Sequence, residues 1–384
     1  MYYLDAESIE IIVQKLNEEG YSVVGPVLRA GAIVYDRVTS AAQLPVGWTD
    51  EQQPKTYRMK PGSSGAMFGY AVGPHSWKRF LFPPVQKIFG SRRVGKNFEV
   101  EHDGQPSPAP RYAFLGVRPC ELAAMAIQDK VFDNGLYVDK DYKALRDQAF
   151  VIAVNCSHPA GTCFCTSMGT GPEAKSGFDL VLTEVIDERA HFFAVESGSD
   201  RGNQFLARIP HRPLEPGEVE KTRGVVEGAR RRIRKTFDPT DIKELLYENF
   251  EHSYWDDVAK RCLSCANCTL VCPTCFCTTI EDVTDLTGDN AERWRKWDSC
   301  FTMDFSYIHG GSIRSSVRSR YRQWITHKLA SWIDQFGTSG CVGCGRCITW
   351  CPVGIDITEE AWSIRQRASP HMQTQEKEIH DGKP

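Results

Sequence analysis

The stretch CLSCANCTLVCP at residues 262–273 has the same cysteine pattern as CVGCGRCITWCP at residues 341–352. Both follow the spacing C-x2-C-x2-C-x3-C-P, and neither contains a histidine. Thiolates at this spacing are the ligands of cubic [4Fe–4S] clusters, since a short loop can wrap three corners of the cube while the fourth ligand comes from elsewhere. The two runs therefore predict two [4Fe–4S] clusters in the C-terminal part of the chain.

The prolines and the paired runs are typical of bacterial two-cluster ferredoxins, in which the fourth cysteine of each run binds the other cluster. We therefore assign the first cluster to Cys262, Cys265, Cys268 and Cys351, and the second to Cys341, Cys344, Cys347 and Cys272. Zinc also accepts four thiolates, but zinc sites more often combine two separated C-x2-C pairs, sometimes with histidine. The paired runs thus favour iron–sulfur clusters over zinc.

Four more cysteines, Cys120, Cys156, Cys163 and Cys165, lie in the first half of the chain. Cys120 and Cys156 come just after two apolar segments, 112–117 and 150–154, that we expect to be strands. If these strands are parallel neighbours, both cysteines emerge at the carboxyl edge of one sheet, and the following loop brings the other two within reach. We predict a third [4Fe–4S] cluster here, with a zinc site or inert buried thiols as the alternatives.

Three cysteines remain, Cys275, Cys277 and Cys300. The first two follow the first run so closely that they must lie near its clusters. They are expected to pack around those clusters and tune them. An incomplete cube with Asp298 as its fourth ligand is the other interpretation, and a different partition of these three with the four cysteines of the first half is also open.

The pattern of strands and helices predicts an α/β domain over residues 1–215, followed by a basic linker at 216–239. The first helix is expected to be capped by Asp5, and the last by Thr358. Apolar residues at three- and four-residue steps over 321–336 predict a helix. We therefore expect an all-α domain over 240–368 that resembles the helical ferredoxin domain of succinate dehydrogenase, and then a polar tail at 369–384.

Composition restricts the class of protein. With a net charge of -3, 41% hydrophobic and 25% charged residues, the 384-residue chain offers no case for nucleic acid as a partner. It has no apolar run of the ~20 residues that cross a bilayer. Because MYYLDAESIE lacks the features of a leader, a cytoplasmic protein is expected, in which 15 cysteines indicate metal ligation rather than disulfides.

No catalytic residue is predicted. The sequence has no G-x-G-x-x-G fingerprint after an expected strand, no Walker motif, no G-x-S-x-G elbow and no H-E-x-x-H pair. Clusters in series form an electron relay. The chain is therefore expected to transfer electrons for a catalytic subunit that is a different polypeptide.

A wider set of motifs carries a resemblance. These motifs are GVRPCEL around Cys120, the NC at Cys156, CFCTSMGTGP from Cys163, both cysteine runs, CPTCFC and the WDSC at Cys300. Together they resemble those of the β subunit of sulfhydrogenases, which are cytoplasmic NAD(P)-linked [NiFe] hydrogenases. The pattern is also similar to the corresponding iron–sulfur subunit of anaerobic sulfite reductase. The resemblance covers most of residues 110–365.

The resemblance implies an iron–sulfur subunit within a hetero-oligomer. Its expected partners are the large and small [NiFe] hydrogenase subunits, a flavin subunit that exchanges hydride with NAD(P), and a ferredoxin or sulfur acceptor. On this analogy the eight cysteines of the two runs are cluster ligands. The rival interpretations are the sulfite reductase subunit, and a zinc-stapled scaffold without redox function.

Overall fold

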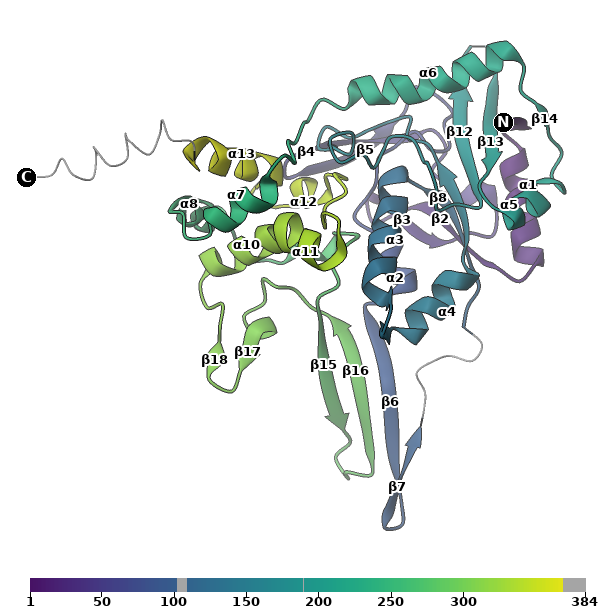
Figure 1. Ribbon diagram of the computed structural model, residues 1–384. Coiled ribbons are helices and arrows are strands. Elements are labelled where there is room, and N and C mark those ends of the chain that lie inside the picture. Colours follow the sequence, from purple (N-terminus) through teal and green to yellow (C-terminus); the bar gives the residue numbers. More distant parts are fainter. Residues whose placement is uncertain (102–108, 189, 369–384) are drawn as a thin grey trace, which may run out of the picture.

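The computed structural model describes residues 1–101, 109–188 and 190–368, and the predicted polar tail at 369–384 lies outside these described residues. The N-terminal part is a layered α/β body, and the C-terminal part packs beside it as a mainly helical body (Figure 1). A narrow β-sheet projects away from both. None of the helices formed by the described residues is long and apolar enough to cross a membrane.

An eight-stranded mixed sheet forms the centre of the α/β body. In spatial order its strands are β14 (Arg212–Pro213), β1 (Tyr2–Asp5), β13 (His191–Ser197), β12 (Leu180–Ile186), β11 (Phe150–Val154), β8 (Tyr112–Val117), β2 (Ser22–Arg29) and β3 (Ala32–Arg37). The four strands from β12 to β2 are mutually parallel, and the outer strands pair antiparallel. The predicted α/β architecture is thus present.

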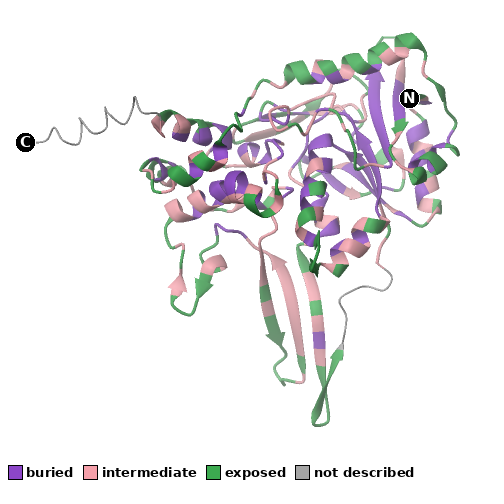
Figure 2. Cartoon of the chain, in the orientation of Figure 1, coloured by how far each residue is buried: buried purple, intermediate pink, exposed green. Residues whose placement is uncertain are grey.

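Both faces of this sheet are covered, which explains why its central strands are apolar without alternation. On β11, Phe150 and Ile152 join the core beneath α1 (Ser8–Glu18) and α5 (Asp200–Leu206). The intervening Val151 joins the core on the other side, beneath α2 (Lys78–Leu81), α3 (Pro119–Phe132) and α4 (Lys140–Gln148). The helices therefore form two layers around the sheet (Figure 2).

The segment that we expected to be a basic linker contains helix α6 (Pro216–Arg232), which lies against β12. Thr222, Val226 and Ala229 form its buried side, and its arginines face outward. A capping box between Glu215 and Glu218 starts the helix. The basic residues thus occupy the outer face of a packed helix, while the boundaries of 1–215 and 216–239 as independent units stay a prediction.

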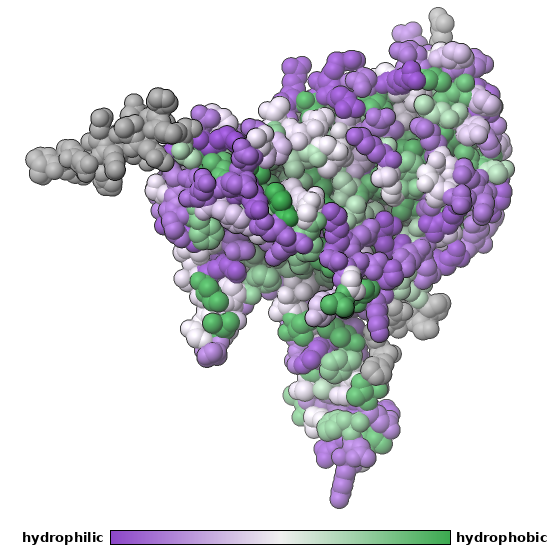
Figure 3. Space-filling view, in the orientation of Figure 1, coloured by the Kyte–Doolittle hydropathy of each residue, from purple (hydrophilic) through white to green (hydrophobic). Residues whose placement is uncertain are grey.

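The projecting sheet, which we call the arm, combines strands from distant parts of the chain. Its order is β15 (Thr278–Thr284), β16 (Asn290–Trp297), β6 (Val85–Val94) and β7 (Asn97–Glu101), all antiparallel. Its side chains are mostly exposed or half-buried (Figure 2). Hydrophobic side chains gather on it (Figure 3), among them exposed Phe98, Val100, Ile280 and Leu286.

The helical body contains α7 (Ile242–Glu248), α8 (Tyr254–Arg261), α9 (Asn267–Leu270), α10 (Val317–Thr326), the π-helical turn η3 (His327–Ser331), α11 (Trp332–Phe336), α12 (Arg346–Thr349) and α13 (Ile357–Ala368). Trp255, Ile325 and Ile364 lie in its core, against which cysteines of both runs pack. Smaller elements are η1 (Ala41–Gln43), η2 (Asp304–Ser306), and the strand pairs β4–β5 (Trp48–Gln53, Thr56–Pro61), β9–β10 (Asp133–Asn134, Tyr137–Val138) and β17–β18 (Tyr307–Ile308, Gly311–Ser312).

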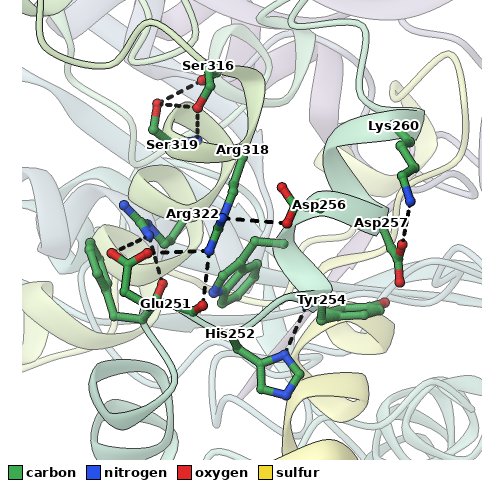
Figure 4. A network of polar contacts seen from close by, with 12 residues as sticks. Glu251, His252, Tyr254, Asp256, Asp257, Lys260, Ser316, Arg318, Ser319 and Arg322 are labelled. Atoms are coloured by element: carbon green, nitrogen blue, oxygen red, sulfur yellow. Dashed lines mark hydrogen bonds and ion pairs between the residues drawn. The ribbon is translucent and has the colours of Figure 1, made fainter. Parts of the chain in front are cut away.

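Helix α8, which leads into Cys262, is fixed on α10 by a polar network (Figure 4). Arg318 contacts the Glu251 carbonyl oxygen at 3.0 Å and the Asp256 carboxylate at 3.5 Å. Arg322 reaches Glu251 at 2.8 Å, and Ser316 caps α10 by accepting the Ser319 N–H. The start of the first cysteine run is therefore anchored to α10.

Three sequence expectations were wrong. The region 240–368 is not all-α, because residues between the two runs form strands β15 to β18, and β16 pairs with β6 of the N-terminal half. Asp5 belongs to β1 and does not cap α1. Thr358 lies inside α13, where its N–H donates to Asp356, which acts as the cap.

Candidate iron–sulfur centre

The two cysteine runs share one backbone conformation. The second residue after the first cysteine has a positive φ in both, 51° at Ser264 and 65° at Gly343. The fourth residue after the first cysteine also has a positive φ, 64° at Ala266 and 76° at Gly345, and a four-residue helix follows in each run. Holding a non-glycine residue this way costs about 1–3 kcal/mol, and such strain concentrates in ligand-binding loops.

Backbone N–H groups point at the cysteine sulfurs in the same positions. Ser264 donates to Cys262 Sγ at 3.4 Å, and Gly343 donates to Cys341 Sγ at 3.5 Å. Ile355 donates to Cys351 Sγ at 3.3 Å. Such donors stabilise thiolate charge and tune cluster potentials, so both loops are organised for anionic sulfur.

Cysteines of both runs meet at the first predicted cluster site. Cys262, Cys265, Cys268 and Cys351 line one enclosed pocket, walled by Phe301, Tyr321 and Trp324. Burial raises the pKa of Cys262, and the neighbouring Cys351 and Cys265 thiolates add to the rise. Thus the last cysteine of the second run lies with the first three of the first run, as the crossed assignment requires.

The reciprocal arrangement holds at the second site. Burial raises the pKa of Cys341 to about 12, and Cys272 is one of the thiolates that contribute. Burial likewise raises the pKa of Cys347 well above its usual range, with Cys341, Cys344 and Cys272 acting in the same direction. Lys328 Nζ lies 3.3 Å from Cys272 Sγ and 3.1 Å from the carbonyl of Gly340, the residue before Cys341. Cys272 therefore lies with the second run, while cluster ligation by these residues stays a prediction.

The four cysteines of the N-terminal half also come together. Strands β8 and β11 are parallel neighbours, so the condition set in the sequence analysis is met. Cys120 lies in the first turn of α3, Cys156 follows β11, and both line one pocket with Cys163 and Cys165. The carboxyl edge of the parallel strands thus assembles a group of four buried or half-buried thiols, and a cluster bound by them stays a prediction.

The second run packs directly on the loop that carries Cys163 and Cys165. The Phe164 N–H donates to the Gly343 carbonyl at 2.9 Å. A Cβ on Gly343 would lie 2.7 Å from the Cys165 nitrogen, and one on Gly345 would lie 2.5 Å from the Thr162 oxygen. Glycine is required at both positions because a side chain would collide with this loop and because φ is positive. The close packing of the second run on the loop brings Cys344 to the pocket of the N-terminal cysteines.

Buried cations accompany two groups of thiols, the four N-terminal cysteines and the second run. Arg118 is 2% exposed and lines the pocket of the N-terminal cysteines. Within the described residues it donates to carbonyl oxygens such as Phe68 O at 2.7 Å, and its Nε has no hydrogen-bond partner. Lys328 Nζ lies 3.3 Å from Cys272 Sγ. Among the described residues, neither cation forms an ion pair with a carboxylate.

An unpaired buried charge is costly, and a thiolate-ligated cluster is negatively charged. A cluster at each site would therefore supply the missing counter-charge. Burial alone would lower the pKa of Lys328, but the thiolates of Cys272, Cys275 and Cys341 raise it overall, so the side chain stays protonated. The residues at both sites fit an anionic iron–sulfur group.

The arrangement suits a cluster better than a single metal ion. In the part of the chain that the structure describes, no group of three or more His, Cys, Asp or Glu side chains is placed to hold one ion. Tetrahedral zinc with bonds of about 2.3 Å would need sulfurs roughly 3.8 Å apart. The thiolates of a cube bind different irons and stand farther apart, so the lack of a single-ion group among the described residues is compatible with cubes at these positions.

The three remaining cysteines, Cys275, Cys277 and Cys300, line a separate cavity. Asp298, the fourth ligand considered from the sequence, is not among the residues that line it. Its carboxylate accepts the Ser299 N–H at 2.7 Å instead. The structure therefore removes Asp298 from this group while bringing the three thiols together.

Comparison with known proteins agrees with this geometry. Residues 261–355 match a 4Fe-4S dicluster domain. The chain is 27% identical to the sulfhydrogenase 2 subunit beta of Pyrococcus furiosus over 366 residues, which cover 94% of this chain and 98% of that protein. This chain is similar to a sulfhydrogenase beta subunit. No solved structure matches it.

The resemblance to sulfhydrogenase beta subunits inferred from the motifs is confirmed by this comparison, and it extends into the N-terminal hundred residues. Binding of [4Fe–4S] clusters is supported by the dicluster domain that spans both runs. The domain match begins at residue 261 and ends at 355, so it does not bear on the N-terminal group of four cysteines.

Proposed function

We propose that this chain is the iron–sulfur electron-transfer subunit of a sulfhydrogenase-like complex. The observation that carries the proposal is that the groups of thiols adjoin one another. Cys344 lines the pocket of the N-terminal cysteines, and Cys347 lines the pocket of the first run. Bound clusters would each take up and release one electron, and their proximity favours transfer from one to the next.

This proposal assigns the ligands of three clusters. Cys262, Cys265, Cys268 and Cys351 would hold the first, Cys341, Cys344, Cys347 and Cys272 the second, and Cys120, Cys156, Cys163 and Cys165 the third. The buried cations Arg118 and Lys328 support the last two, since each lacks a carboxylate partner in the described ranges. The chain's own residues position the clusters and set their charge environment.

One end of the proposed relay lies at the surface. Cys265 is exposed, and its neighbours Leu263 and Leu270 are 63% and 44% exposed. Exposed leucines beside a redox centre form the kind of surface that a partner protein covers. We therefore place exchange of electrons with a partner at the first run, and the buried N-terminal group at the other end.

The partners we propose are a [NiFe] hydrogenase pair of large and small subunits and a flavin subunit that exchanges hydride with NAD(P), with a ferredoxin or sulfur compound as acceptor, in the cytoplasm. The arm supports assembly into a complex, because it exposes Phe98 and Leu286 on a sheet that the described chain leaves uncovered.

Purification of the native complex under exclusion of oxygen tests this proposal. Nickel in the preparation, together with reduction of NAD(P) by H2 that requires this chain, is the expected result. Sirohaem and sulfite reduction in its place would instead assign the chain to a sulfite reductase. A chain that purifies alone with zinc and little iron would contradict both.

A further inference from the structure

The cavity lined by Cys275, Cys277 and Cys300 has a volume of about 340 Å³ and belongs to neither run's cluster site. Its formation follows from the arm. Strand β15 begins one residue after Cys277, and β16 ends three residues before Cys300. Pairing of Thr278 with Trp297, and the Asp298 N–H bond to the Cys277 carbonyl at 2.8 Å, therefore bring the thiols to one point at the base of the arm.

Buried lysines lie beside this cavity, as buried cations lie beside the N-terminal cysteines and the second run. Lys328 lines it and reaches Thr274 Oγ1 at 3.0 Å as well as Cys272. Lys78, 4% exposed, donates to the carbonyls of Cys272 at 3.2 Å and Cys275 at 3.0 Å. Within the described ranges neither lysine pairs with a carboxylate, so two buried positive charges face this set of thiols.

The helix beside the cavity is distorted where it meets the thiols. The turn η3 is π-helical, and it interrupts what would otherwise be one helix from α10 to α11. Insertions of this kind are frequent at functional sites. Here the turn supplies His327 and Lys328 to the lining of the cavity, and Trp324 and Trp332 complete its apolar wall.

We propose that Cys275, Cys277 and Cys300 hold a fourth iron–sulfur cluster by three thiolates. No fourth cysteine is among the described residues that line the cavity, so a cluster held here would have one iron without a thiolate ligand, and Arg314 and His327 line the same cavity. That iron would accept a small exogenous anion. The site differs from the relay clusters in this respect, and the inference is independent of which catalytic subunits accompany the chain.

The thiols would give up their protons to solvent on binding iron. Three thiolates around a [4Fe–4S]2+ core would carry a net charge of −1, which the buried lysines would face. Cys272 remains with the second run, although Lys78 Nζ donates to the carbonyls of both Cys272 and Cys275. The fourth site therefore lies directly beside the second predicted cluster, close enough to exchange electrons with it.

The test compares the full chain with the triple variant Cys275→Ser, Cys277→Ser, Cys300→Ser, both prepared without oxygen and reconstituted with iron and sulfide. The expected result is a loss of about four irons and four sulfides per chain, with the signals of the other clusters unchanged by electron paramagnetic resonance. Equal iron in the two proteins would overturn the proposal. A disulfide between Cys277 and Cys300 in native protein isolated without oxygen would overturn it too.

Single variants keep the proposal testable if the triple variant fails to fold. Cys300→Ala changes one small side chain and is expected to remove the same signal, whereas Cys341→Ser should remove the signal of the second run instead. Identical spectra for these two variants would overturn a separate fourth cluster. Cyanide probes the open iron: it should alter the spectrum of the unmodified chain and leave that of Cys300→Ala unaltered. A spectrum insensitive to cyanide in the unmodified chain would overturn the open position.

Discussion

Replacement of Lys328 by methionine tests whether buried charge tunes the proposed clusters. The side chain is 4% exposed, and its Nζ lies 3.3 Å from the Cys272 sulfur that we assign to the second cluster. A positive charge there stabilises the reduced cluster, which carries one more electron. Removing the charge without removing the side-chain volume should therefore lower the reduction potential of that cluster.

The size of the effect follows from the geometry. An electron spread over the cube lies on average about 6 Å from Nζ, and at an effective dielectric constant of about 20 the interaction is about 2.8 kcal/mol. At about 59 mV for each 1.36 kcal/mol, this corresponds to a fall of roughly 120 mV. The Gly340 carbonyl, which accepts from Lys328, keeps a second donor in Thr274 at 2.7 Å, so the backbone should not rearrange.

The assay is a redox titration followed by electron paramagnetic resonance, with iron analysis to establish that the clusters are intact. Lys143→Met serves as control, because it removes the same charge from an exposed position on α4. The control should leave all potentials unchanged. A Lys328→Met protein with full iron content and an unshifted potential would refute the reasoning.

Three further predictions follow from the contacts. Cys272→Ser should remove the cluster of the second run and spare that of the first, as seen by electron paramagnetic resonance; loss of the Cys262 signal alone would disprove the crossed assignment. Gly345→Ala should destabilise the protein by roughly 2–5 kcal/mol through its positive φ and its clash with Thr162, whereas Ala266→Gly at nearly the same φ should not destabilise it, and equal melting temperatures would contradict the close packing. Phe98→Ser combined with Leu286→Ser should keep full iron content but lose partner subunits in affinity purification, and undiminished recovery of partners would exclude the arm as a docking surface.

The sequence predicted the groups of cysteines well, because the ligand spacing is itself the chemical requirement. The two strands β8 and β11 were also predictable, since strands buried on both faces are apolar without alternation, and their parallel pairing entered as a condition that the structure meets. With these two features, the placement of Cys120 near Cys156 followed without any knowledge of the rest of the chain.

The buried cations could not be predicted in the same way. Lys78 contacts Cys272 across 194 positions of sequence, and nothing near it in the sequence distinguishes it from a surface lysine. The strands of the arm were missed for a related reason. Strand β16 pairs with β6 from the other half of the chain. The sequence of residues 240–368 therefore does not contain the strand that stabilises β16.

Crystals grown without oxygen and measured at the iron absorption edge test the central claim most directly. We predict cube-sized iron peaks between Cys351 and the first three cysteines of the first run, and between Cys272 and the first three of the second. Iron peaks enclosed by the four cysteines of a single run, or the absence of iron at both positions in protein that still transfers electrons, would contradict it.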